Sequence, residues 1–288
     1  MIESFLNYAK YSRGFSENSI IKFQKGLKRF ESFLNERGKT ADNPEKILLL
    51  DICDFIAKMR IDWLCPWSCN AILDWVKAYF KWLRDILERD VLDAKKIKGC
   101  KMPARKIGYF NKEEKNQILN IVKSWMWVRE LTKLRNKLLT YMLLHTGLRC
   151  YEIAKIKVNE IWENLQVIGK WGKRRFVYLR PEILDMIKSY LKKRKNNSEF
   201  LFNGRRDTNH LKTWSIRNIF IKMTRMSGIH IHAHKFRHTF CTDLLHVPWA
   251  NIYAVSKLMW HSKITTTQIY LGVDNQELKS LQFWLKFS

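Results

Sequence analysis

Four short segments of the sequence carry side chains that could bind a phosphate or move a proton. An arginine guanidinium presents a fork of donors that matches phosphate, and an imidazole can transfer a proton near neutral pH. The segments are Thr146-Gly-Leu-Arg149-Cys-Tyr-Glu152, Gly169-Lys170-Trp-Gly-Lys-Arg174, His230-Ile-His-Ala-His234-Lys-Phe-Arg237-His238 and His261-Ser-Lys-Ile-Thr-Thr-Thr-Gln-Ile-Tyr270.

Each segment also has an ordinary explanation when it is taken alone. Arg149 and Glu152 are three residues apart, so on a helical turn they would form a surface ion pair of little energetic value. Lys170 lies in an expected turn, where a lysine is usually a solvated charge. Tyr270 could be a core residue whose hydroxyl is hydrogen-bonded. No single segment decides the function.

The histidine-rich segment allows two interpretations. On a strand, His230, His232 and His234 would alternate onto one face and could hold a metal ion. Zinc sites usually recruit cysteine or a carboxylate, however, and the nearest acid is Asp243. At the start of a helix, His234 and Arg237 would instead face one pocket together. The residues alone leave both interpretations open.

The charge of the chain indicates a polyanionic partner. Its 288 residues hold 53 Lys and Arg against 27 Asp and Glu, a net charge of +26, and residues 1–100 contribute only +4 of this excess. Such an excess repels itself unless a polyanion neutralises it, and nucleic acid is the first candidate. An anionic membrane surface would need a basic amphipathic helix or a lipidation signal, and neither stands out.

Composition excludes several other classes of protein. Hydrophobic residues make up 46% of the chain, with 11 Gly and 5 Pro, which is typical of a globular protein and not of a disordered or collagen-like one. No stretch approaches the roughly 20 apolar residues that a bilayer span needs. No secretory signal is visible. We therefore expect a cytoplasmic protein whose six cysteines stay reduced.

Apolar periodicity predicts that the first hundred residues are helical. Residues 16–36 carry apolar side chains at three- and four-residue spacing after Ser16, a suitable helix cap. Segments 47–60 and 68–89 follow the same pattern. Residues 93–108 are polar and basic, with Gly and Pro as breakers, and this composition predicts a linker.

The second half is predicted to be mostly helical as well, starting at Asn111. The exception is a pair of β-prone runs, residues 165–168 and 175–179, which flank a basic turn that contains glycine. This pattern predicts a hairpin whose turn would present Lys170 to a phosphate.

In this chain order, the four segments resemble the tyrosine recombinase (phage integrase-like) family. The best-matching stretches are Thr146–Glu152, His234–Thr239 and His261–Tyr270, and the resemblance covers nearly the whole chain. The compact length resembles a simple Xer-like member. The implied fold is mainly α, with a helical core-binding (SAM-like) domain over residues 1–92, the basic linker over 93–108, and a mostly helical catalytic domain with a small β-hairpin over 109–288.

The resemblance implies transesterification at DNA phosphodiesters. Tyr270 would attack the phosphate and end attached to a 3′ phosphate, and strands would be exchanged through a Holliday junction. Arg149 and Arg237 would clamp that phosphate and stabilise the charge that builds on its oxygens. No metal or nucleotide cofactor is required. The implied catalytic side chains are Arg149, Lys170, His234, Arg237, His261 and Tyr270.

The resemblance also implies how the remaining groups would act. His261 would donate a hydrogen bond to the same phosphate, and His234 would accept the proton of Tyr270. Lys170 would protonate the departing 5′ oxygen, which is otherwise a poor leaving group. Glu152 would position the neighbouring arginine or its turn.

The implied partners are double-stranded DNA and three further copies of the chain, which form a homo-tetramer on two DNA sites without a membrane. Residues 275–288 form an apolar tail that would dock on a neighbouring protomer, with packing in cis as the alternative. Other functions remain open at this point. They are a type IB topoisomerase-like nicking-closing enzyme, a DNA-binding protein without activity, and a metal enzyme built on His230, His232 and His234.

Overall fold

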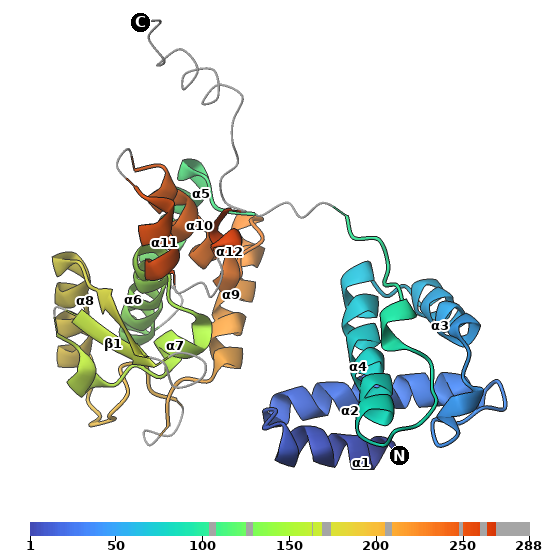
Figure 1. The fold of residues 1–288 in the computed structure, drawn as a ribbon. Helices are drawn as coiled ribbons and strands as arrows, with labels where there is room; N and C mark the ends of the chain where they lie inside the picture. Colours follow the sequence, from blue (N-terminus) through green and yellow to red (C-terminus); the bar gives the residue numbers. More distant parts are fainter. Residues whose placement is uncertain are drawn as a thin grey trace, which may run out of the picture. The chain divides into compact units, whose positions relative to one another are not determined.

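Helices dominate the computed structural model because long segments with apolar three- and four-residue spacing alternate with short polar loops (Figure 1). The chain forms two compact units, Met1–Arg105 and Lys106–Ser288. The structure describes residues 1–103, 108–124, 129–162, 164–168, 174–204, 209–247, 250–259 and 264–268. No helix in these ranges is long and apolar enough to span a bilayer.

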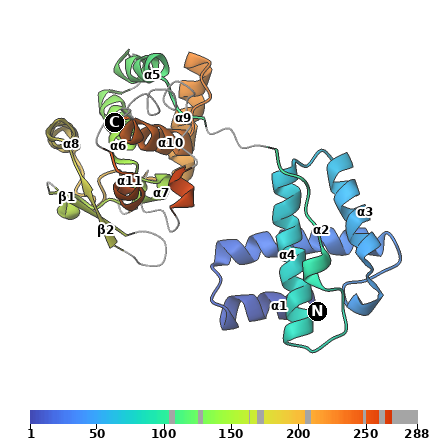
Figure 2. The same cartoon turned by 45° about the horizontal axis from the view of Figure 1, so that its top comes forward.

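The first unit is entirely helical, as the sequence predicts (Figure 2). Its core is rich in aromatic rings, among them Phe30, Phe55 and Phe80, which are no more than 1% exposed. Tyr79 is also buried, and its hydroxyl donates a hydrogen bond of 2.9 Å to the carbonyl of Ala41. The elements are α1 (Ile2–Asn7), a π-helical turn (Tyr8–Ser12), α2 (Glu17–Asn35), α3 (Leu49–Ile61), α4 (Pro66–Asp85) and the 3₁₀ turns Pro44–Lys46 and Ala94–Lys96.

The helix ends follow local chemistry. Ser16 caps α2, because its Oγ accepts a hydrogen bond from the backbone N–H of Ser19 at 3.4 Å. Pro66 stands in the first turn of α4, where its missing N–H costs nothing, so this helix starts two residues earlier than the sequence predicts. The sequence did not predict the short helix α1.

Residues 93–103, part of the expected linker, lie against the first unit. Asn70 on α4 clamps this segment, because its Oδ1 accepts from the N–H of Cys100 at 2.7 Å and its Nδ2 donates to the carbonyl of the same residue at 3.0 Å. Ile97 is 3% exposed and joins the core. The basic segment therefore extends the first unit as far as the described residues reach.

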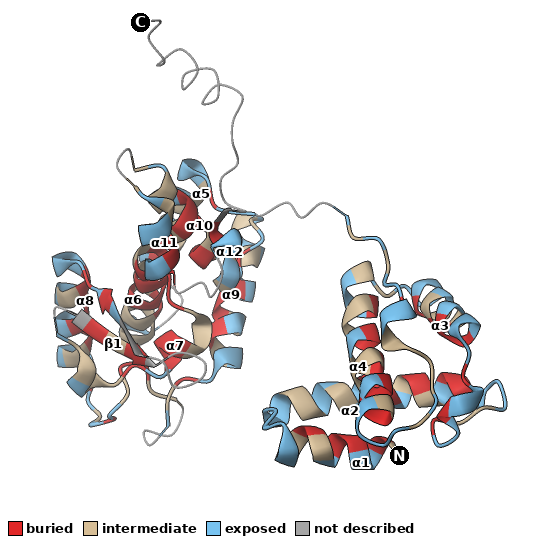
Figure 3. Ribbon diagram, viewed as in Figure 1, coloured by how far each residue is buried: buried red, intermediate tan, exposed pale blue. Residues whose placement is uncertain are grey.

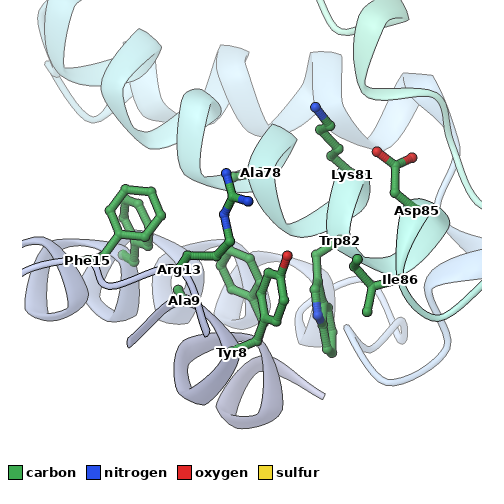
Figure 4. A pocket seen from close by; sticks show the side chains of 11 residues that line it. Tyr8, Ala9, Arg13, Phe15, Ala78, Lys81, Trp82, Asp85 and Ile86 are labelled. Atoms are coloured by element: carbon green, nitrogen blue, oxygen red, sulfur yellow. The ribbon is translucent and has the colours of Figure 1, made fainter. Parts of the chain in front are cut away.

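A hollow of about 340 Å³ opens beside α1, the π-helical turn and α4 in the first unit (Figure 4). Tyr8 and Trp82 form its aromatic floor, with ring centroids 6.2 Å apart. Arg13 and Lys81 add positive charge to its rim.

The second unit is organised around α6 (Glu130–Thr146), in which eight of 17 residues are buried (Figure 3). It contacts α5 (Lys112–Ser124), α8 (Pro181–Lys193) and α10 (Ala233–Leu245). The predicted hairpin is confirmed: β1 (Asn164–Ile168) pairs antiparallel with β2 (Arg174–Tyr178), and Leu165 lies opposite Val177. The remaining elements are α7 (Cys150–Ala154), the 3₁₀ turn Val158–Glu160, α9 (Thr213–Ser227), α11 (Ile252–Leu258) and α12 (Thr265–Gln268).

All six cysteines lie among the described residues, and all six are unpaired thiols. Two of them belong to the second unit, where Cys150 is half-buried and Cys241 is buried. Burial raises the pKa of the Cys150 thiol to about 11 and that of Cys241 to about 12. Both thiols are therefore protonated, and unreactive as nucleophiles, at neutral pH.

Gly147 allows the chain to turn sharply from α6 into α7. Its φ is +60°, a left-handed conformation that favours glycine. A Cβ at this position would lie 2.4 Å from Cδ1 of Phe240 on α10. The missing side chain therefore permits both the turn and the close approach of α10.

We expect Gly147→Ala to destabilise the second unit by roughly 2–4 kcal/mol, because it adds a steric clash to backbone strain. Gly228→Ala is the matched control: Gly228 also ends a helix with φ of +72°, but a Cβ there would meet nothing within 4 Å. Gly228→Ala should lower the free energy of unfolding by about 1 kcal/mol. Urea unfolding measures both, and equal losses would contradict the close packing at Gly147.

Candidate active site

Arg149 stands at the N-terminal end of α7, directly after the turn at Gly147. Its Nη1 donates to Oε1 of Glu152 at 2.9 Å, and its backbone N–H donates to Oε2 of the same carboxylate at 2.8 Å. The Glu152 side chain is fully buried, whereas 29% of the Arg149 side chain is exposed. A buried carboxylate thus fixes both the helix start and the orientation of the guanidinium.

Arg237 lies on α10 and is 5% exposed. Its Nη1 donates to the carbonyl oxygen of Gly147, and its Nη2 donates to the carbonyl oxygen of Met259 at the end of α11. These acceptors lie two residues from Arg149 and two residues from His261. Arg237 therefore joins its own segment to that of Arg149 and to the residue two positions before His261.

His234 lies in the first turn of α10, three residues before Arg237, so the predicted helix start is confirmed. It lines a pocket of about 770 Å³ that also contains Cys150, the residue after Arg149. The strand interpretation of His230, His232 and His234 is wrong, because His234 belongs to a helix. In the part of the chain that the structure describes, no group of three or more His, Cys, Asp or Glu is arranged to hold a metal ion.

Side chains distant in sequence hold α10 in place. Thr239 is fully buried; its Oγ1 accepts from the N–H of Phe110 at 2.8 Å and donates to the carbonyl of Lys235 at 2.8 Å. Nζ of Lys235 lies 3.3 Å from Oε1 of Glu114 on α5 and 4.4 Å from the centre of the Phe110 ring. No local sequence pattern indicates these positioning residues, because their partners are more than 100 residues away.

The other three predicted catalytic residues, Lys170, His261 and Tyr270, lie outside the described residues. So does the expected tail over residues 275–288. The described elements end close to each of them in sequence. Strand β1 ends at Ile168, α11 is followed by Met259, and α12 ends at Gln268.

Comparison with known families identifies the chain. The phage integrase family matches residues 109–277, and the N-terminal SAM-like domain of phage integrases matches residues 2–85. The chain belongs to the phage integrase family. As a member, it is a tyrosine recombinase, an enzyme of site-specific DNA recombination, with the mainly helical fold that the sequence predicts.

Curated relatives span most of the chain. Tyrosine recombinase XerC of Leptospira interrogans is 29% identical over 97% of this chain and 90% of its own length. Tyrosine recombinase XerA of Pyrococcus furiosus is 28% identical over 80% of this chain and 78% of its own length. The predicted likeness to Xer-like members of the family is therefore confirmed.

Solved structures share the fold. The XerH recombinase bound to a palindromic difH substrate, in a post-cleavage complex, has a TM-score of 0.76 at 19% identity and covers 98% of this chain and 84% of its own. A lambda integrase dimer bound to a COC′ core site has a TM-score of 0.73 at 17% identity, over 94% of this chain and 78% of its own. These comparisons give no support to the topoisomerase alternative.

We expect Arg237→Lys to destabilise the second unit by about 2–3 kcal/mol, because a lysine ammonium cannot donate to two carbonyls in a fixed fork. Arg149→Lys is the comparison, since that side chain is partly exposed and a lysine can still pair with Glu152; its cost should be about 1 kcal/mol. Urea unfolding of both variants measures the difference. If Arg237→Lys were as stable as the wild type, the bridge between the carbonyls of Gly147 and Met259 would be unimportant.

Proposed function

We propose that Tyr270 is the nucleophile that cleaves DNA, forming a 3′-phosphotyrosyl intermediate and releasing a 5′ hydroxyl. A phenol with a pKa of about 10 is mostly protonated at pH 7, so the attack needs a base and a polarised phosphate. The covalent bond retains the energy of the phosphodiester. A 5′ hydroxyl from another duplex can then reverse the step, and two rounds of exchange pass through a Holliday junction.

Arg149 and Arg237 hold the scissile phosphate in this mechanism. Two guanidinium groups stabilise the negative charge that grows on the non-bridging oxygens as the tyrosine attacks. The observation that carries the proposal is the contact of Arg237 with the carbonyls of Gly147 and Met259. It brings the segment of Arg149 and the segment leading to His261 to the helix that carries His234.

The remaining side chains transfer protons and orient the phosphate. His234 accepts the proton of Tyr270 as the phenol attacks, and Lys170 donates a proton to the departing 5′ oxygen. His261 donates a hydrogen bond to the phosphate. The excess of positive charge after residue 100 supports binding to the DNA backbone around this site.

Tyr270→Phe should abolish covalent capture of a nicked suicide DNA substrate while leaving duplex binding unchanged, since only the nucleophilic oxygen is removed. Denaturing gels score the adduct, and fluorescence anisotropy over a salt series scores binding, which should weaken steeply as salt rises. Tyr253→Phe is the matched control, because Tyr253 is an exposed phenol on α11. An adduct formed by Tyr270→Phe would show that another residue is the nucleophile.

We further propose that four copies assemble on two DNA sites and that residues 275–288 of each copy dock on a neighbour. This segment holds Leu278, Leu281, Phe283, Trp284, Leu285 and Phe287. The second unit offers an apolar hollow of about 430 Å³ between α6, β2, α10 and α11. Phe176 and Tyr178 on its edge are 60% and 67% exposed. Exposed apolar surface of this kind is typical of a binding site for another chain.

Deleting residues 276–288 should reduce the tetramer on two DNA sites to smaller complexes, because the apolar segment that links the copies is lost. Mass photometry of the protein on DNA measures the assembly. The control is the full chain with Lys279→Ala and Lys286→Ala, which changes the same segment without removing its apolar side chains. An unchanged tetramer after the deletion would favour packing in cis.

A further inference from the structure

The helix that carries His234 and Arg237 begins at an unusual cap. His232 is the N-cap residue of α10, with extended backbone angles of φ −150° and ψ 158°. The N–H of Lys235 points back to it and lies 3.2 Å from its Nδ1 and 3.0 Å from its carbonyl oxygen. N-cap positions favour Ser, Thr, Asp and Asn, whose side-chain oxygens accept this hydrogen bond whenever the protein is near neutral pH.

We propose that His232 is a positioning residue of the active site: its neutral imidazole holds the first turn of α10, and thereby His234 and Arg237, in place for strand cleavage. The inference rests on the proposed function, in which these two side chains act on the scissile phosphate. It adds a residue that does not touch the DNA but decides whether the helix start is ordered.

Only the neutral imidazole can perform this role. Nδ1 accepts the Lys235 N–H through a lone pair, and protonation converts that lone pair into a second donor. The proton would also place a positive charge at the N-terminus of α10, where the helix dipole is already positive. Protonation of His232 therefore removes one interaction that holds the helix start and adds a repulsive one.

The surroundings of His232 also oppose a positive charge. Its ring centroid lies 5.1 Å from that of His230. The residues facing the same pocket from α7 and α9, or next to the ring in sequence, include no carboxylate. Their titratable or charged members are Cys150, Arg217, Arg225, His230, His234 and Lys235.

The pKa of His232 is lowered from its ordinary value, first by partial burial and then by the charges of His230, His234 and Lys235. The unfolded chain therefore binds this proton more readily than the folded one. The stabilisation from the cap is complete above the unfolded pKa of about 6.5 and is lost as the pH falls below it. Acid should loosen the start of α10 before it unfolds the unit.

The experiment measures the rate of covalent capture of a suicide DNA substrate between pH 8 and pH 5. In the wild type, the rate should fall as the pH drops below 6.5, because protonation of His232 breaks the cap. His232→Thr carries a cap that does not titrate, so its rate should fall less steeply with acid and lie within about twofold of the wild type at pH 7.5. His232→Ala should be slower than the wild type by about fivefold at pH 7.5, and this difference should shrink towards pH 5, where the wild type loses its cap as well.

His246→Ala is the matched control. His246 ends the same helix, and its Nδ1 lies 2.7 Å from the carbonyl of Thr242, so protonation at that end agrees with the helix dipole. The capture rate of this variant should fall with acid as steeply as that of the wild type. If the rate of His232→Thr falls as steeply too, the proposal is overturned. A change in the melting temperature of His232→Thr without a change in this pH dependence would indicate only a structural role, and would overturn it as well.

A second readout separates this proposal from the catalytic assignments. The amide signal of Lys235 in ¹H–¹⁵N spectra should shift with pH in the wild type and not in His232→Thr, whatever the reaction rate. If the Lys235 amide titrates but His234→Ala cleaves at the wild-type rate with the same fall at acid pH, His234 is not the base. The cap at His232 then still stands. If the amide does not titrate with His232, the cap proposal fails by itself.

Discussion

The arrangement of the second unit depends on the buried guanidinium of Arg237. Its two carbonyl partners, at Gly147 and Met259, belong to segments that are 90 and 22 residues away in the chain. A charged donor that bridges two carbonyls inside a protein is strongly favoured over the same groups left unpaired. The bridge therefore fixes the ends of α6 and α11 against α10, and a group with fewer donors could not replace it.

Several weaker features make this bridge possible. Gly147 has no side chain, so the backbone can turn sharply and approach the ring of Phe240. Glu152 is buried and neutralised by Arg149, which lets a carboxylate lie beside a site that must bind a polyanion. The result is a site in which Arg237 holds the fold together and is also proposed to bind the phosphate, while Arg149 is oriented by a carboxylate and remains partly exposed.

Local features could be predicted from the sequence, and contacts between distant residues could not. The cap at Ser16, the helix start at Asn111 and the hairpin around residues 165–179 depend on neighbours within a few positions, and the structure confirms them. The mainly helical fold class followed from apolar periodicity and from the family resemblance, whereas a helix at His234 and Arg237 was one of two interpretations that the residues left open. The partners of Arg237 and Thr239 are separated from them by many residues, so no local pattern indicates them. The sequence did not indicate the N-cap at His232, because histidine is not a usual capping residue.

A structure of the protein trapped on a suicide DNA substrate tests most directly whether both arginines bind one phosphate. We expect the guanidinium groups of Arg149 and Arg237 both to lie within about 3 Å of oxygens of the same phosphate. We also expect this phosphate to be bonded to the phenol oxygen of Tyr270, while Arg237 keeps its hydrogen bonds to the carbonyls of Gly147 and Met259. A phosphate bound by only one of these arginines, with the other facing a separate cavity, would contradict this expectation.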